Sequence, residues 1–135
     1  MYHKILVPVA FDADHDGHRG VAIARALAAP DAEITLLHVM EEVPAYAISY
    51  MPPEFREQTR AAVTEALQGY ADEMGDGRVA VVEGSPGSRI THWAQEHGCD
   101  LIVISSHRPG LQDYVLGSTA GRVVRHAPCA VHVIR

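Results

Sequence analysis

Several signals that often assign a function are missing from this chain of 135 residues. Neither of the glycine-rich phosphate-binding motifs, G-x-x-x-x-G-K-[ST] and G-x-G-x-x-G, occurs. The two cysteines, Cys99 and Cys129, fit no metal-ligand spacing and no disulfide framework. Both lie at the entrances of segments that resemble strands, so we interpret them as small buried apolar side chains.

Basic residues are also few, with 11 Lys and Arg against 17 Asp and Glu and a net charge of -6. This balance argues against a nucleic-acid partner, which would require a basic stripe, although a local group of donors can still hold a small anion. No apolar run is long enough to cross a bilayer, and no secretory signal follows Met1. We therefore expect no membrane partner and a cytoplasmic location.

The apolar content of 47% is sufficient for one buried core, and we expect a single domain over residues 1–135. Three of the strand-like segments carry nearly continuous apolar runs, which is typical of strands buried on both faces of a parallel sheet. The five predicted strands are residues 4–10, 33–40, 78–83, 100–106 and 129–135.

Segments with helical periodicity lie between these strands, at residues 21–27, 53–74, from 85 onward, and 118–126. In the third, Ser85 is a candidate N-cap and Pro86 suits the first turn. Its inward face would consist of Ile90, Trp93, Ala94 and His97. The alternation predicts right-handed crossovers and one doubly wound α/β domain with helices on both faces. Residues 41–52 carry two tyrosines and are either a flap beside a site or an ordinary loop.

Open parallel sheets bind ligands beyond the carboxyl ends of their strands, so the loops after residues 10, 40, 83 and 106 are the places to inspect. The first loop begins like a calcium-binding loop, with Asp12, Asp14 and Asp16. Its twelfth position is Ile23 instead of Glu, and a strand precedes it, so we reject calcium. The nine histidines are scattered, and we predict neither a metal site nor a catalytic triad.

The fourth loop feeds the last helix at "GSTAGRVV" and is the best candidate for an anion site. Gly117 allows close approach at a helix N-terminus, and the hydroxyls of Ser118 and Thr119 could reach phosphate oxygens or a water on magnesium. Arg108 adds a planar guanidinium. In the alternative interpretation, Ser118 only caps the helix and Arg108 is solvated. These local residues do not decide between the two.

The whole chain resembles the universal stress protein family. "KILVPVA", "ITLLHVME", "VEGSPGSRI" and "DLIVISSH" are similar to its strands, and "LGSTAGRVVRHAPCAVHVIR" is similar to its C-terminal signature. The resemblance implies a Rossmann-like fold, related to the adenine nucleotide α-hydrolases, with five parallel strands in the order 3-2-1-4-5. It also implies a homodimer that pairs through the last strand, around Val131 and Val133.

Members of this family that bind ATP carry Gly, two residues, Gly, nine residues, Gly and then Ser or Thr. Here Ser105 and Arg108 stand at the first two glycine positions, the loop to Gly117 is one residue short, and Ala10 stands where Asp is usual. We interpret Arg108 as a substitute contact to phosphate. The resemblance then implies ATP, with or without Mg²⁺. The residues implied to bind it are Pro8, Val9, Ala10, Val39, Ile104, Ser105, Ser106, His107, Arg108, Gly117, Ser118 and Thr119.

Three functions follow as hypotheses. The first, which we favour, is a dimeric ATP-binding stress protein that acts through nucleotide-dependent interactions, with no catalytic residue or very slow ATP hydrolysis. The second is an interaction module that binds no nucleotide, as the two missing glycines and Ala10 would allow. The third is an ATP hydrolase or nucleotide α-hydrolase. Its only candidate base is His107, which we interpret instead as a hydrogen-bonding loop residue.

Overall fold

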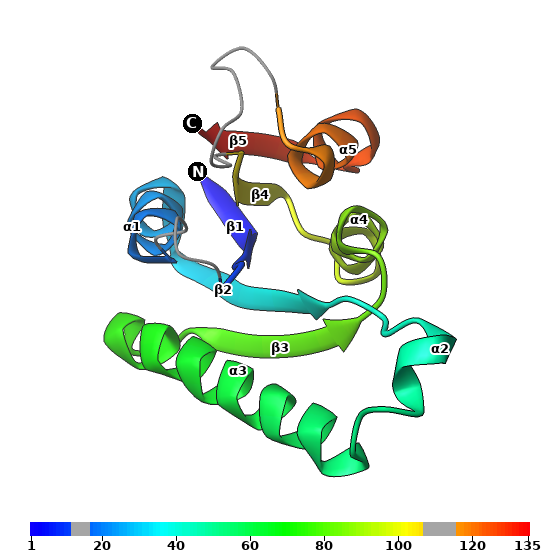
Figure 1. Ribbon diagram of the computed structural model, residues 1–135. Helices are drawn as coiled ribbons and strands as arrows, with labels where there is room; N and C mark the ends of the chain where they lie inside the picture. Colours follow the sequence, from blue (N-terminus) through cyan, green and yellow to red (C-terminus); the bar gives the residue numbers. More distant parts are fainter. Residues whose placement is uncertain (12–16, 107–115) are drawn as a thin grey trace.

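The computed structural model describes residues 1–11, 17–106 and 116–135, and five parallel strands form one sheet in the order β3-β2-β1-β4-β5 (Figure 1). This is the predicted order. The strands are β1 (Tyr2–Pro8), β2 (Ala28–Met40), β3 (Arg78–Glu83), β4 (Leu101–Ser105) and β5 (Ala130–Ile134). The helices are α1 (Gly17–Leu27), α2 (Ala45–Ile48), α3 (Pro53–Met74), α4 (Pro86–Glu96) and α5 (Ser118–His126).

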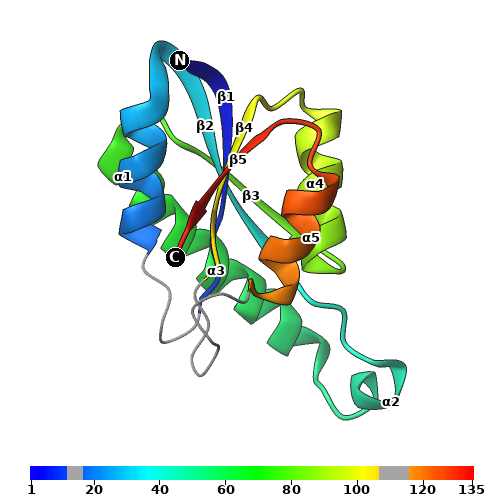
Figure 2. The same ribbon diagram turned by 90° about the horizontal axis from the view of Figure 1, so that it is seen from above.

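The sheet is covered on both faces, as the continuous apolar runs predicted (Figure 2). Alternate residues of β1 point to opposite faces. Ile5 and Val7 belong to a core shared with α1 and α3, while Leu6 belongs to a second core shared with α4 and α5. All three side chains are at most 1% exposed. The prediction of a doubly wound sheet is therefore confirmed.

Strand β2 begins at Ala28, five residues before the predicted start at 33. The added segment contains Pro30 and Asp31, which are unfavourable in strands, so the sequence pattern did not reveal it. Pairing with β1 explains the extension, because Tyr2 of β1 pairs with Ala28. The register between the two strands then shifts, so that Lys4 pairs with Glu33. At the other end, the backbone N–H of Val9 donates to the carbonyl of Leu37 at 2.8 Å.

The helices bury narrower faces than their periodicity predicted. In α4, Ile90 and Ala94 are buried as expected, but His97 is exposed and stacks on the half-buried Trp93 with ring centroids 3.8 Å apart. Ser85 occupies the N-cap position without a side-chain capping bond. Pro86 at the first turn therefore contributes through its fixed backbone angle.

Residues 41–52 contain the short helix α2, which extends beyond the carboxyl end of β2 (Figure 1). Tyr46 is 78% exposed and Tyr50 is 86% exposed, so this segment packs little against the domain. No helix within the described residues is long and apolar enough to cross a membrane.

Candidate functional site

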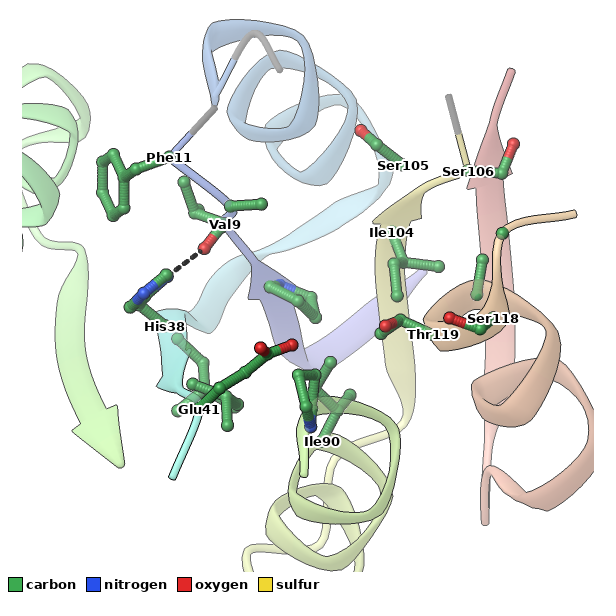
Figure 3. A pocket seen from close by; sticks show the side chains of 17 residues that line it. Val9, Phe11, His38, Glu41, Ile90, Ile104, Ser105, Ser106, Ser118 and Thr119 are labelled. Atoms are coloured by element: carbon green, nitrogen blue, oxygen red, sulfur yellow. Dashed lines mark hydrogen bonds between the residues drawn. The ribbon is translucent and has the colours of Figure 1, made fainter. Parts of the chain in front are cut away.

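A cavity of about 580 Å³ opens at the carboxyl ends of the central strands (Figure 3). It lies between β1 and β4, where the strand order reverses. From β1 the chain continues to β2 and β3 on one side of the sheet, and then crosses to β4 and β5 on the other side. Its walls come from β1, β2, β4 and the first turns of α4 and α5. The volume is in the range of small-ligand sites.

Ten of the twelve residues predicted from the sequence line this cavity, and the other two, His107 and Arg108, lie outside the described residues. The structure thus brings together segments that are more than one hundred residues apart in the chain. The ten are Pro8, Val9, Ala10, Val39, Ile104, Ser105, Ser106, Gly117, Ser118 and Thr119.

The prediction missed seven further lining residues: Phe11, Leu37, His38, Glu41, Pro86, Ile90 and Ala120. His38 and Glu41 flank Val39 in the segment "LLHVME", so their position after the second strand was an available signal. Pro86 and Ile90 reach the cavity because α4 begins after the carboxyl end of β3 and packs against one face of the sheet. No local sequence pattern indicates that contact.

One end of the cavity is apolar and is formed by β1, β2 and α4. Val9, Val39 and Ile90 are buried there, next to the half-buried Pro8 and Pro86. Apolar walls of this kind bind a flat hydrophobic ring without requiring charge.

A polar pair lies at the rim of the apolar end. His38 Nδ1 lies 2.7 Å from the carbonyl oxygen of Val9, and the ring of Phe11 meets the imidazole edge-on at 5.1 Å between centroids (Figure 3). Because a carbonyl only accepts, Nδ1 carries the hydrogen and donates it. In the neutral ring, Nε2 is then an acceptor.

The other end of the cavity is the N-terminus of α5. Gly117 is the N-cap with extended backbone angles, and no side chain of the described residues caps the helix. Ser118 is the first helical residue, so the interpretation of Ser118 as the cap is wrong. The first N–H groups of α5 and the hydroxyls of Ser118 and Thr119 are therefore placed at the positive end of the helix dipole.

The two serines at the end of β4 differ in their roles. Ser106 is buried, and both its N–H and its hydroxyl donate to the carbonyl of Ile134, at 2.9 and 3.2 Å. Its hydroxyl therefore ties β4 to β5. Ser105 is half-buried at the cavity wall and makes no such side-chain bond among the described residues.

Charge is sparse in this cavity. Of its described lining residues, Glu41 is the only acid and His38 the only other ionisable side chain. In the described parts of the chain, no three His, Cys, Asp or Glu side chains come close enough to hold a metal ion. His18, from the loop that was weighed for metal binding, instead lies 3.2 Å from the carboxylate of Glu73.

The fold and the position of the cavity define a doubly wound α/β protein with a cavity at its topological switch point. The family model described as "Universal stress protein family" matches residues 1–135, and the chain belongs to this family. It is 30% identical to universal stress protein G of Shigella flexneri over 142 residues, covering 100% of both chains. It is also 30% identical to a putative universal stress protein of Staphylococcus haemolyticus, covering 99% of this chain and 85% of the relative.

Solved structures agree with this assignment. The universal stress protein UspA from Lactobacillus plantarum is 29% identical and superimposes with a TM-score of 0.71, covering 99% of this chain and 98% of that chain. A universal stress protein family member from Burkholderia pseudomallei is also 29% identical, with a TM-score of 0.64 over 96% of this chain and 94% of that chain.

Proposed function

We propose that this chain binds an adenine nucleotide, with ATP as the expected ligand, in the cavity at the carboxyl ends of β1, β2 and β4. The observation that carries the proposal is that one cavity joins an apolar end to a helix N-terminus that carries two hydroxyls and that no side chain of residues 1–11, 17–106 or 116–135 caps. A nucleotide has the matching asymmetry, with a flat base at one end and an anionic phosphate chain at the other.

The base is expected at the apolar end. Pro8, Val9, Ala10 and Val39 would contact it, and Ile90 of α4 would cover the opposite side. The ribose would then lie along β4, near Ile104 and Ser105. Most of these contacts use apolar side chains or backbone groups, so they depend on the shape of the cavity.

The phosphates are expected at the N-terminus of α5, where backbone N–H groups and the helix dipole favour an anion. Gly117, Ser118 and Thr119 would provide these contacts, and the hydroxyls could also hold a water of a bound Mg²⁺. His107 and Arg108, which lie outside the described residues, complete this end in the proposal. A guanidinium there would compensate for the glycines that the family motif has and this chain lacks.

Structures with the same fold support adenine as the base. They include a universal stress protein in complex with cAMP, an Arabidopsis thaliana family member with AMP bound, and the Archaeoglobus fulgidus protein in complex with dAMP. At 24, 22 and 19% identity, these proteins share the fold with this chain.

Isothermal titration with ATP and magnesium tests the proposal directly, and an absence of heat at millimolar nucleotide would reject it. Arg108→Ala should weaken ATP more than adenosine, because only ATP places phosphates at that end. Arg125→Ala is the matched control, since Arg125 is exposed in the last turn of α5, away from the cavity. Equal losses for both ligands would remove Arg108 from the phosphate contacts.

We further propose a homodimer that forms through β5 and has no catalytic residue. Among the described residues β5 pairs only with β4, so its outer edge is available to a second copy. Val131 and Val133 are only half-buried in one chain. Light scattering should give twice the chain mass at micromolar concentration. ATP turnover should be very slow and unchanged by His107→Ala.

An interaction module without nucleotide is the second candidate, and the exposed aromatic side chains in and directly after α2 favour it. Tyr46 and Tyr50 lie outside the core on a segment that projects from the domain. The two functions are separated by a mass spectrum of small molecules released from natively purified protein. Recovery of an adenine nucleotide would argue for the first, and a protein without any nucleotide that gives no heat with ATP would argue for the second.

A further inference from the structure

Glu41 is the only acidic side chain among the described residues that line the cavity, and it follows β2 directly. Its carboxylate points into the cavity, between Val9 and Ile90 (Figure 3). Within residues 1–11, 17–106 and 116–135, Glu41 makes no hydrogen bond and no ion pair. The carboxylate is thus free to meet a ligand.

The position of this charge divides the cavity electrostatically. Glu41 follows β2 and lies with Val9 and Val39 at the apolar end, whereas the positive end of the α5 dipole lies at Gly117. A phosphate group would be repelled by the carboxylate and attracted to the helix N-terminus. Because the ribose is expected along β4, the part of a nucleotide that would meet Glu41 is the base.

A carboxylate can only accept hydrogen bonds, so its partner on the base must be a donor. The exocyclic amine of adenine is such a donor. A purine that carries a keto oxygen at the same position would bring two acceptors together and leave both without a partner. Sites that hydrogen-bond one ligand group discriminate strongly against analogues that lack it.

We propose that Glu41 is a specificity-determining residue that accepts a hydrogen bond from the exocyclic amine of the bound base. The inference rests on the proposed binding of an adenine nucleotide and adds to it a side chain that selects the base. Glu41 would do so beside apolar walls that carry the imidazole of His38 at their rim.

The test compares ATP with purine riboside triphosphate, which differs only in having hydrogen in place of the 6-amino group. Both ligands carry the same charge, so the ratio of their dissociation constants cancels the general effect of removing a negative side chain. We expect the wild type to bind ATP about tenfold more tightly, as a hydrogen bond to a charged group predicts. Glu41→Ala should bring the ratio close to one.

Two further variants sharpen the result. Glu41→Gln keeps one uncharged acceptor oxygen and should give an intermediate ratio. Glu42→Ala removes the neighbouring exposed carboxylate, which does not line the cavity, and should keep the wild-type ratio. Because Glu41 is exposed, its replacement should leave thermal unfolding unchanged.

The outcomes are distinguishable. If the wild type binds both triphosphates equally, or if Glu41→Ala keeps the wild-type ratio, the role of Glu41 is rejected while nucleotide binding stands. If the wild type binds neither ligand, the proposed function itself is wrong. A shared gain in affinity for both ligands in Glu41→Ala, without a change in their ratio, would show that the carboxylate acts only as a repulsive charge.

Discussion

His38 and Val9 are joined by a 2.7 Å hydrogen bond from the imidazole Nδ1 to the main-chain carbonyl oxygen. Val9 lies just beyond β1, where the regular pairing with β2 ends, and its N–H already donates to the carbonyl of Leu37. The side chain of His38 therefore adds one more hydrogen bond between β2 and the segment after β1, at the rim of the cavity. Phe11 packs edge-on against the same ring and covers it from the outside.

We predict that His38→Ala lowers the free energy of unfolding by about 1 kcal/mol, since it leaves the half-buried carbonyl of Val9 without its partner. The variant should also bind ATP more weakly, because the backbone at the base end would no longer be held in place. Urea unfolding and titration measure the two effects. His92→Ala is the control, because His92 is exposed and its one polar contact within the described part of the chain is with Glu96 on the same helix. Equal stability of both variants would contradict the prediction.

Asp100 fastens β4 to β1 at the opposite end of the sheet. Its two carboxylate oxygens accept the backbone N–H groups of His3 and Lys4, each at 2.9 Å, and its own N–H donates to the carbonyl of Lys4. Burial works against the charge, but these backbone donors outweigh it and hold the pKa of Asp100 below its ordinary value of about 3.8.

We predict that Asp100→Asn is less stable than the wild type by about 1 kcal/mol at neutral pH, because an amide offers one acceptor oxygen instead of two. Because folding lowers the pKa of Asp100, its carboxylate stabilises the fold at pH values above its ordinary pKa. This contribution is lost as the pH falls through the folded-state pKa. The difference between the two proteins should therefore be constant from about pH 5 to 7 and shrink below about pH 4. Urea unfolding at several pH values measures it. Asp76→Asn, on an exposed turn, is the control, and a difference that persists unchanged at low pH would refute the prediction.

The sequence predicted the sheet from its residues, because strands buried on both faces have continuous apolar runs. The strand order that the family resemblance implies then places the loops after β1 and β4 beside each other. Gly117 was found from the helix that it precedes, whereas Ala10 was named only through the resemblance.

What the sequence did not predict depends on how elements pack in three dimensions. A helix of 22 residues such as α3 is about 33 Å long, whereas a strand of six residues such as β3 spans about 20 Å. Helix α3 is therefore longer than β3, and Phe55 in its first turn is 53% exposed although it continues the apolar stripe. The contact of Ile90 with the cavity depends in the same way on where α4 crosses the sheet.

The two cysteines lie half-buried against the core formed with α4 and α5. Burial raises the pKa of the Cys99 thiol to about 11, and the nearby Cys129 makes a smaller contribution in the same direction. Burial also raises the pKa of Cys129. Since the thiolate is the reactive form, only about one Cys99 in a thousand would be reactive at pH 8.

We therefore predict that iodoacetamide labels the native protein slowly at pH 8 and labels the urea-unfolded protein rapidly. Mass spectrometry measures the rate, and Cys99→Ala and Cys129→Ala assign each modification to its residue. The native rate should increase as pH rises toward 11. Native labelling as fast as that of the unfolded chain would contradict the burial described for both thiols.

A substitution at Gly117 tests whether phosphates bind at the N-terminus of α5, and it should do so without disrupting the fold. Its backbone angles, φ -60° and ψ 159°, are open to any residue, and a Cβ built there would lie 3.6 Å from the carbonyl oxygen of Ser106, an ordinary contact. The fold itself therefore does not require glycine at this position. Alanine is a poorer N-cap, so we expect Gly117→Ala to cost at most about 1 kcal/mol of stability.

The same substitution should weaken ATP binding at least tenfold, because the added methyl group occupies the space through which phosphate oxygens would approach the N–H groups of α5. Adenosine, which has no phosphate, should be affected less. Titration with both ligands and urea unfolding provide the measurements. Gly69→Ala is the matched control, since Gly69 is exposed within α3 with no atom near its missing Cβ, and it should raise stability by about 0.5–1 kcal/mol without changing affinity. If Gly117→Ala binds ATP as tightly as the wild type, the phosphates do not lie at the N-terminus of α5.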